Sequence, residues 1–64
     1  MNVTAKDLSA GDVVRIRALD DLPSHLFEVQ TVEEDCVTGT ALCGPLKGEY
    51  GEPDLSLIVE VCWP

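Results

Sequence analysis

Three cysteines and one histidine are the residues best suited to chemistry in this chain: Cys36, Cys43, Cys62 and His25. A zinc site or a catalytic thiolate needs such groups at ligand or hydrogen-bond distance, usually at spacings such as Cys-x-x-Cys. The cysteine spacings do not form that motif, and an odd number of cysteines does not close a disulfide framework. We therefore expect reduced thiols in a cytoplasmic protein, a surface histidine, no metal and no cofactor.

Two further patterns fall short of an active site. The segment from Gly44 to Gly51 is rich in glycine but lacks the Gly-x-x-x-x-Gly-Lys-Ser/Thr sequence of a phosphate-binding loop. A pairing of Cys43 with His25 stays open, because sequence does not place the two side chains in contact. We also expect so small a core to lack room for a ligand cavity of about 300 Å³ or more. These points together predict that the protein is not an enzyme.

Charge is the strongest compositional signal. The 64 residues include twelve Asp and Glu against four Lys and Arg, for a net charge of −8. Such a chain repels nucleic-acid backbones and anionic membranes, and it attracts basic protein surfaces. Neither a transmembrane run nor a signal peptide is visible. The composition predicts a protein partner with a basic surface, and no direct contact with nucleic acid or membrane.

The acidic residues fall mainly in expected turns, where two aromatic residues are suited to anchor a partner. Sequence does not say whether these turns share one end of the fold. The alternative is that the acidity only keeps a small domain soluble. The candidate partner-binding residues are Asp20, Asp21, Glu33, Glu34, Asp35, Glu49, Tyr50, Glu52, Asp54 and Trp63.

Alternating apolar and polar residues predict the strands that position these turns. Thr4 is expected to cap a single helical turn near the N-terminus. Gly39 interrupts the alternation of its strand, as a bulge or a sharp bend does. We expect strands over residues 12–19, 26–33, 36–43 and 55–62, with a short additional strand near Glu49 and Tyr50.

The first two strands are expected to form a hairpin in which one register satisfies both faces. That register pairs apolar residues on the inner face and opposite charges on the outer face. It places Ile16 opposite Val29, Ala18 opposite Phe27 and Arg17 opposite Glu28. The predicted core consists of Val14, Ile16, Phe27, Val29, Leu42, Leu57 and Val59.

Four to five short antiparallel strands predict an all-β fold, with residues 1–64 as one small closed barrel, since closure removes exposed sheet edges. The opening Leu8-Ser9-Ala10-Gly11-Asp12-Val13-Val14-Arg15-Ile16 resembles the SH3-like small-barrel group, in which a turn and Gly-Asp lead into a β-branched strand. The resemblance implies that fold and brings no functional residues with it. The acidity of the chain departs from the nucleic-acid-binding members, and an OB-like barrel is the alternative fold.

These features together predict a non-enzymatic acidic module that binds a basic protein surface, as an inhibitor or an accessory subunit. In size and charge the chain resembles small phage-encoded anti-CRISPR proteins, which implies that its acids occupy a groove that otherwise holds nucleic acid. We expect such a module to be a monomer or a weak homodimer. One alternative is a structural or assembly protein that dimerises through its last strand and Trp63. Others are a small SH3-like subunit of a larger complex, and a small enzyme or thiol-redox protein that uses a cysteine.

Overall fold

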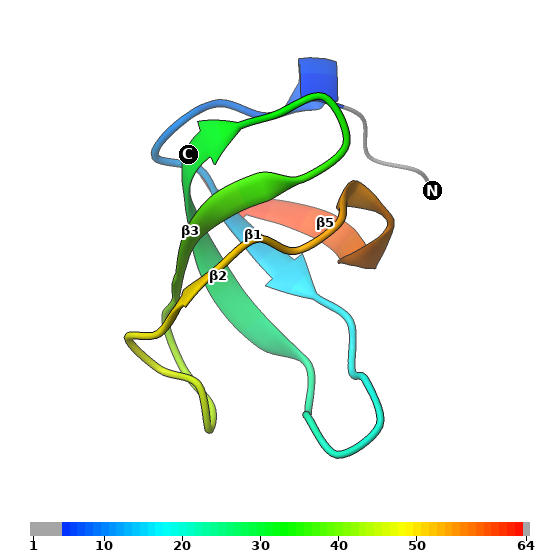
Figure 1. The fold of residues 1–64 in the computed structure, drawn as a ribbon, viewed down its shortest axis with the longest axis vertical. Coiled ribbons are helices and arrows are strands. Elements are labelled where there is room, and N and C mark those ends of the chain that lie inside the picture. The colour runs from blue at the N-terminus through cyan, green and yellow to red at the C-terminus, as the bar shows by residue number, and fades with distance from the viewer. Residues whose placement is uncertain (1–4, 64) are drawn as a thin grey trace.

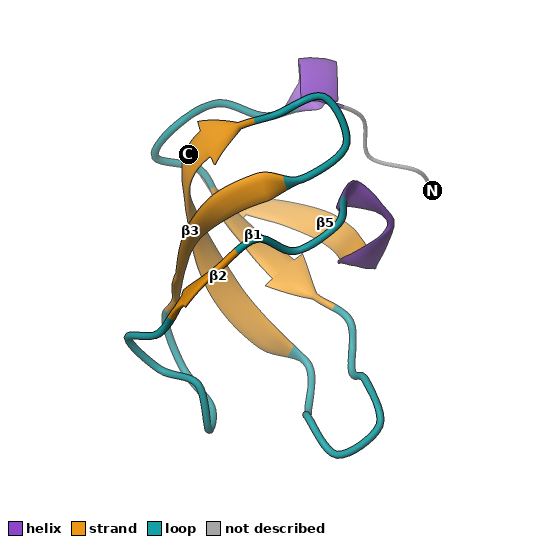
Figure 2. Ribbon diagram, in the orientation of Figure 1, coloured by secondary structure: helices purple, strands orange, loops and turns teal. Residues whose placement is uncertain are grey.

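The computed structural model describes residues 5–63 of the chain, and the side chains of residues 6–62. Five strands form one antiparallel sheet in the order β4-β3-β2-β1-β5 (Figure 1). Two short 3-10 turns accompany the strands (Figure 2). The elements are η1 (Ala5–Asp7), β1 (Val13–Ile16), β2 (His25–Val32), β3 (Val37–Ala41), β4 (Tyr50–Gly51), η2 (Leu55–Leu57) and β5 (Ile58–Trp63).

The all-β class, the strand number and the helical turn near the N-terminus are therefore confirmed. The predicted cap Thr4 lies outside the described residues. Across residues 5–63, no hydrogen-bonded ladder joins β4 to β5, so closure into a barrel stays a prediction. The second turn, η2, was not expected from sequence.

The β1–β2 hairpin turns at Asp20 and Asp21. The Leu19 N–H donates to the Leu22 carbonyl at 2.9 Å, and the Leu22 N–H donates back to the Leu19 carbonyl. Asp20 has a φ of +39°, in the left-handed region that Asp visits more readily than most residues. This two-residue turn fixes which residues of β1 and β2 lie opposite one another.

In the observed register, Val14 lies opposite Phe27 and Ile16 lies opposite His25. The expected register needs a turn centred on Leu22 and Pro23, later in the chain than the one that forms. The side chains expected to face inward in β1 and β2 still do so, because the register differs by an even number of residues. The expected pairs Ile16–Val29, Ala18–Phe27 and Arg17–Glu28 are wrong.

Gly39 allows β2 and β3 to pack closely. A Cβ at this position would lie 1.9 Å from the backbone oxygen of Glu28 and 2.9 Å from the Phe27 ring. The β2–β3 register shifts between Val29 and Thr31, beside the Val29–Gly39 pair. The extra residue is Gln30 in β2, whereas β3 keeps its alternation with Gly39 facing inward, so the bulge lies opposite Gly39 and not in its own strand as expected. The packing requires that Gly39 has no side chain.

The last predicted strand begins instead with η2. The Asp54 side chain accepts a hydrogen bond from the Ser56 N–H at 3.1 Å and so caps this turn. Helical geometry over three residues changes the phase of the alternation, so that Ile58 is buried and Val59 is 45% exposed. The expectation that Val59 belongs to the core is wrong for this reason.

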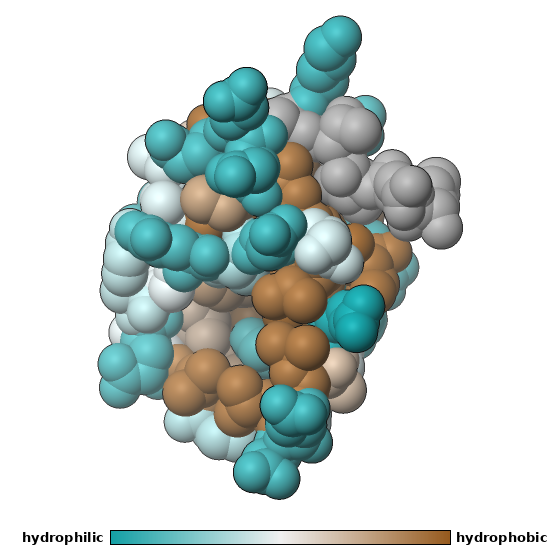
Figure 3. Space-filling view, turned by 45° about the vertical axis from the view of Figure 1, so that its right-hand side comes forward, coloured by the Kyte–Doolittle hydropathy of each residue, from teal (hydrophilic) through white to brown (hydrophobic). Residues whose placement is uncertain are grey.

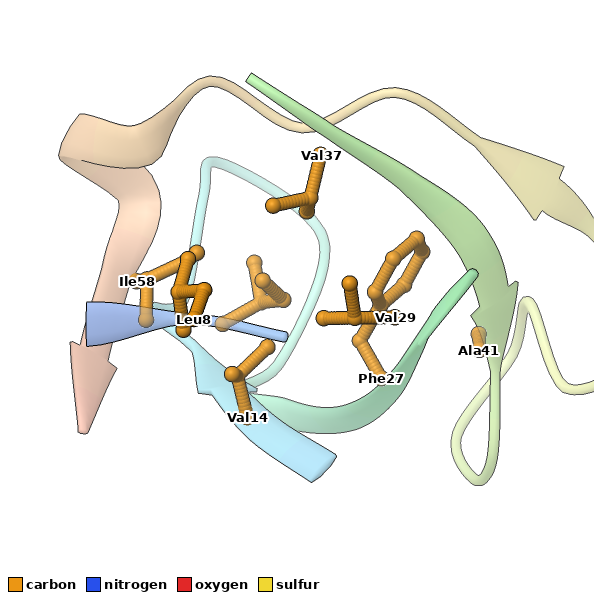
Figure 4. Packing of buried hydrophobic residues seen from close by; sticks show 8 residues of the cluster. Leu8, Val14, Phe27, Val29, Val37, Ala41 and Ile58 are labelled. Atoms are coloured by element: carbon orange, nitrogen blue, oxygen red, sulfur yellow. The ribbon is translucent and has the colours of Figure 1, made fainter. Parts of the chain in front are cut away.

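A single apolar cluster fills the space that the strands enclose (Figure 4). Val14, Ile16, Phe27 and Val29 are buried, as expected. Leu42 is 37% exposed, because Ala41 is the inward residue at that end of β3. Leu57 is only partly buried against the cluster. Four core residues were not predicted as such: Leu8, Val37, Ala41 and Ile58.

Candidate functional site

A pocket of about 270 Å³ opens at one end of the core. Its floor includes Ile16, Phe27 and Ala41, which are buried members of the apolar cluster. Figure 3 shows apolar residues in brown around a hollow in the lower half of one face, below hydrophilic residues in teal. The volume approaches the roughly 300 Å³ at which small-molecule sites begin, which we expected the chain to lack.

The walls of the pocket come from three connections between strands. Leu19 and Leu22 flank the β1–β2 turn, Leu46 belongs to the β3–β4 loop, and Leu57 ends η2. Figure 1 shows the β1–β2 turn and the β3–β4 loop side by side at the lower end of the molecule. Leucines from segments distant in sequence thus converge on the open end of the core.

One rim of the pocket is acidic and aromatic. Glu49, Tyr50 and Glu52 lie along it, and all three are exposed. The Tyr50 hydroxyl donates a hydrogen bond to Glu52 Oε2 at 2.8 Å. That bond, with partial desolvation and the Glu52 charge, raises the pKa of Tyr50, although a hydrogen bond from Thr38 acts in the opposite direction. The rim therefore joins carboxylates directly to an aromatic contact surface.

His25 also lines the pocket and is only 9% exposed, so the expectation of a surface histidine is wrong. Its Nδ1 lies 3.1 Å from the Pro23 carbonyl oxygen. A carbonyl only accepts, so Nδ1 carries the proton in this bond. The contact fixes the imidazole ring and places a polar group in a mainly apolar pocket.

A second acidic region surrounds Cys36, where the β2–β3 turn meets the segment after β4. The Leu55 N–H donates to the Asp35 carbonyl at 3.0 Å, and Cys36 forms an isolated bridge with Asp54. Partial burial raises the pKa of the Cys36 thiol, and the negative charges of nearby carboxylates raise it further. We call this region the acidic edge; its carboxylates are Glu33, Asp35, Glu52 and Asp54.

The acidic edge joins predicted site residues that are far apart in sequence. Glu52 belongs both to this edge and to the pocket rim, so the two regions are continuous. Glu34 is exposed in the same β2–β3 turn. Asp20 and Asp21 belong to the β1–β2 turn, which lies beside the pocket wall residues Leu19 and Leu22 and at the other end of the molecule from the β2–β3 turn (Figure 1). Trp63 ends β5, and its side chain lies outside the described part of the structure.

Among the described residues, no carboxylate of the acidic edge forms an ion pair with a basic side chain. Arg15 binds Glu60 between β1 and β5, with Nε 2.6 Å from Oε1. That hydrogen bond and the Glu60 charge raise the pKa of the Arg15 guanidinium. The exposed Lys47 lies in the β3–β4 loop, near the pocket rather than the acidic edge. The negative charges of the acidic edge are therefore not neutralised by direct pairing with a basic side chain.

The cysteines are all free: Cys36 is partly buried, whereas Cys43 and Cys62 are exposed. Cys43 Sγ lies 3.4 Å from the Leu26 N–H, as a hydrogen-bond acceptor. Within the described residues, no cluster of His, Cys, Asp and Glu is arranged to hold a metal ion. In the same part of the chain, no helix is long and apolar enough to cross a membrane.

Sequence reasoning identified the rim residues Glu49, Tyr50 and Glu52 but missed the pocket beside them. Its wall residues Leu19, Leu22 and Leu46 stand in segments rich in Asp, Gly and Pro, where they have no periodicity. A signal was nevertheless present, because several large apolar residues in neighbouring turns can gather into one exposed apolar patch, and such patches mark binding grooves.

The fold and the site thus define a small antiparallel β protein with an apolar pocket at the end of an acidic surface. No protein-family model matches the chain, and no similar chain was found among curated proteins or solved structures. Any function must therefore be argued from the site itself.

Proposed function

We propose that this protein is a non-enzymatic acidic binding module that acts in the cytoplasm on a partner protein with a basic surface. It serves as an inhibitor or an accessory subunit. In the sharpest form of the proposal, the partner surface is a groove that otherwise holds nucleic acid, which the carboxylates replace. Three free thiols support a reducing compartment.

The observation that carries the proposal is the continuity of the acidic edge with the pocket rim. Carboxylates from the β2–β3 turn and from the segment after β4 gather on one side and meet Tyr50 there. Like charges so placed repel one another, and a basic partner relieves that repulsion. An aromatic side chain beside them supplies contact area that charge alone does not.

The test begins with capture of the partner from an extract of the host cell, followed by measurement of association rates with the purified partner. The variant Glu33→Gln/Asp35→Asn removes two charges from the acidic edge. The matched control Glu28→Gln/Glu60→Gln removes two charges from exposed positions on β2 and β5 that neither line the pocket nor belong to the acidic edge. We expect the edge variant to associate several-fold more slowly, while the control stays close to the original rate.

Salt provides a second measurement on the same complexes. Steering by exposed charges weakens as the screening length falls, from about 10 Å at 0.1 M salt to about 3 Å at 1 M. We expect association of the unmodified protein to slow with salt more steeply than that of the edge variant. Equal rates for both double variants, with no salt dependence, would reduce the acidity to a solubility device and remove the proposal.

A second candidate is assembly through the last strand. β5 is an edge strand, and Val59 and Val61 on it are 45% and 36% exposed. Exposed apolar residues on an unpaired edge favour strand pairing between copies. A mass that rises with concentration and returns to the monomer value in Val59→Lys supports this candidate, whereas a constant monomer mass eliminates it.

A further inference from the structure

The pocket, rather than the acidic edge, contains the feature that selects a partner segment. Its floor and walls are mainly apolar, and its volume of about 270 Å³ is small for a metabolite site. A space of that size suits a single large side chain offered by another protein. Aromatic and aliphatic anchors seated in such pockets dominate protein interfaces.

Charge around the opening restricts what flanks that anchor. Glu49 and Glu52 stand exposed on the rim, and the acidic edge continues from Glu52. An acidic segment brought to this rim is repelled, and a neutral one forms no ion pair with the carboxylates. Lys and Arg beside the anchor instead place opposite charges next to these carboxylates.

We propose that the pocket binds a segment of the partner protein in which one large apolar side chain, such as Leu, Met or Phe, is flanked by Lys and Arg. The inference rests on the proposed function and deepens it. The apolar side chain contacts Leu46, Leu57 and the Phe27 ring on the pocket floor and walls. The basic residues lie over Glu49 and Glu52, and Tyr50 packs beside the anchor.

Two leucines of nearly equal exposure provide a matched pair of variants. Leu46 is 39% exposed and lines the pocket, whereas Leu42 is 37% exposed and lies outside the lining. Both side chains are partly in water, so replacement by Ser should leave the fold intact, which a melting curve verifies. Tyr50→Ala, at a position 60% exposed, is a second pocket variant that should also fold.

The probes are synthetic peptides with the sequence Ser-Lys-Arg-Thr-Leu-Thr-Arg-Lys-Ser, together with versions that carry Ser in place of Leu or Gln in place of every Lys and Arg. Burial of a leucine side chain should make the first peptide bind about tenfold or more tightly than the serine version. That advantage should disappear in Leu46→Ser and Tyr50→Ala but persist in Leu42→Ser. Chemical shifts of the Leu46 and Leu57 methyl groups should move only with the leucine peptide.

The outcomes separate this inference from the function on which it rests. Equal, salt-sensitive binding of the leucine and serine peptides overturns the pocket inference and leaves the acidic module standing. Strong binding of the uncharged leucine peptide overturns the charge argument, and with it the proposed function. The inference is also overturned if Leu46→Ser and Leu42→Ser weaken binding of the leucine peptide equally. It is overturned as well if the protein self-associates and Leu46→Ser abolishes that self-association, because the pocket then binds a second copy of the chain.

Discussion

The pocket and the acidic edge share Glu52 but differ in how they expose their residues to water. In the pocket, Phe27 and Ala41 are part of the folding core, so the same side chains stabilise the fold and form the floor. At the acidic edge, the carboxylates of Glu33 and Asp35 stay in solvent. Apolar surface removed from water contributes about 25 cal/mol per Å², whereas an exposed ion pair contributes about 0–1 kcal/mol.

The difference assigns separate tasks to the two regions in the proposed function. Exposed charges act at a distance and change how often a partner arrives. A pocket acts on contact and changes how long the partner stays. Because the acidic edge and the pocket are adjacent on this small domain, a partner that reaches the edge can contact both regions at once.

Replacing Phe27 by Ala tests the region on which both the core and the pocket depend. The ring is 3% exposed, so its removal should destabilise the fold by about 3–5 kcal/mol. A chain of this length has a stability near the low end of about 5–15 kcal/mol, so most of the variant should be unfolded. Urea unfolding measures this, and a cooperative transition near the original midpoint would remove Phe27 from the core.

Gly39→Ala disturbs the packing below the pocket without removing a side chain. The new Cβ meets the Glu28 backbone oxygen at 1.9 Å, and backbone does not move aside easily. We expect a loss of about 3 kcal/mol, at the upper end of the usual range for overpacking. Gly51→Ala is the control, because its Cβ would meet the Phe27 ring at 3.6 Å and Pro53 Cδ at 4.0 Å, which are ordinary contact distances. Equal melting temperatures for the two variants would contradict the close approach of β2 and β3.

The part of the fold that sequence predicted best is the β1–β2 hairpin face. Val14, Ile16, Phe27 and Val29 alternate strictly with polar residues, and burial of one face is what that alternation encodes. The register was lost because turn-forming residues run from Asp20 to Ser24, and the pattern does not show which two of them form the turn. Local pattern therefore predicts which side faces inward more reliably than which residue lies opposite which.

The candidate site was predicted only in part, since it depends on contacts between distant segments. Asp35 and Asp54 were each identified as acidic turn residues. They lie close together beside Cys36 only because the fold brings two distant segments into contact. The Asp54 cap also changes the phase of the chain at Leu57, which brings that residue to the pocket wall. Pattern alone does not show a cap that competes with an extended strand.

Cys36 offers a reporter for the acidic edge, with a smaller effect than the core variants. Only the thiolate reacts with iodoacetamide, and both partial burial and the surrounding carboxylates raise the pKa of Cys36. Cys36 should therefore be alkylated more slowly than the exposed Cys43 and Cys62. Glu52→Gln or added salt should increase the alkylation rate of Cys36 several-fold, whereas Glu60→Gln on β5 should leave that rate unchanged. If Cys36 reacts fastest of the three cysteines, the account of how burial and nearby carboxylates raise its pKa is contradicted.

The same pKa shift predicts a pH dependence of stability. A thiol whose pKa is raised in the folded state holds its proton more tightly there than in the unfolded chain. Its contribution is present below the ordinary thiol value of about 8.5 and is lost as pH rises through the higher folded pKa. Unfolding free energies measured across that alkaline range should fall less steeply in Cys36→Ser than in the unmodified protein. If unfolding free energy falls equally steeply with pH in both proteins, the pKa of Cys36 does not differ between the folded and unfolded states.

The most direct test of the account measures the association and dissociation rate constants of the leucine-centred basic peptide by surface plasmon resonance. The peptide is tested on the unmodified protein, on Glu33→Gln/Asp35→Asn and on Leu46→Ser, each at low and at high salt. The account predicts that the edge variant slows association and leaves dissociation unchanged. It predicts that Leu46→Ser speeds dissociation and leaves association unchanged, with salt acting on association. Association that responds to neither salt nor the edge variant, or dissociation that ignores Leu46→Ser, would contradict the division between a steering edge and an anchoring pocket.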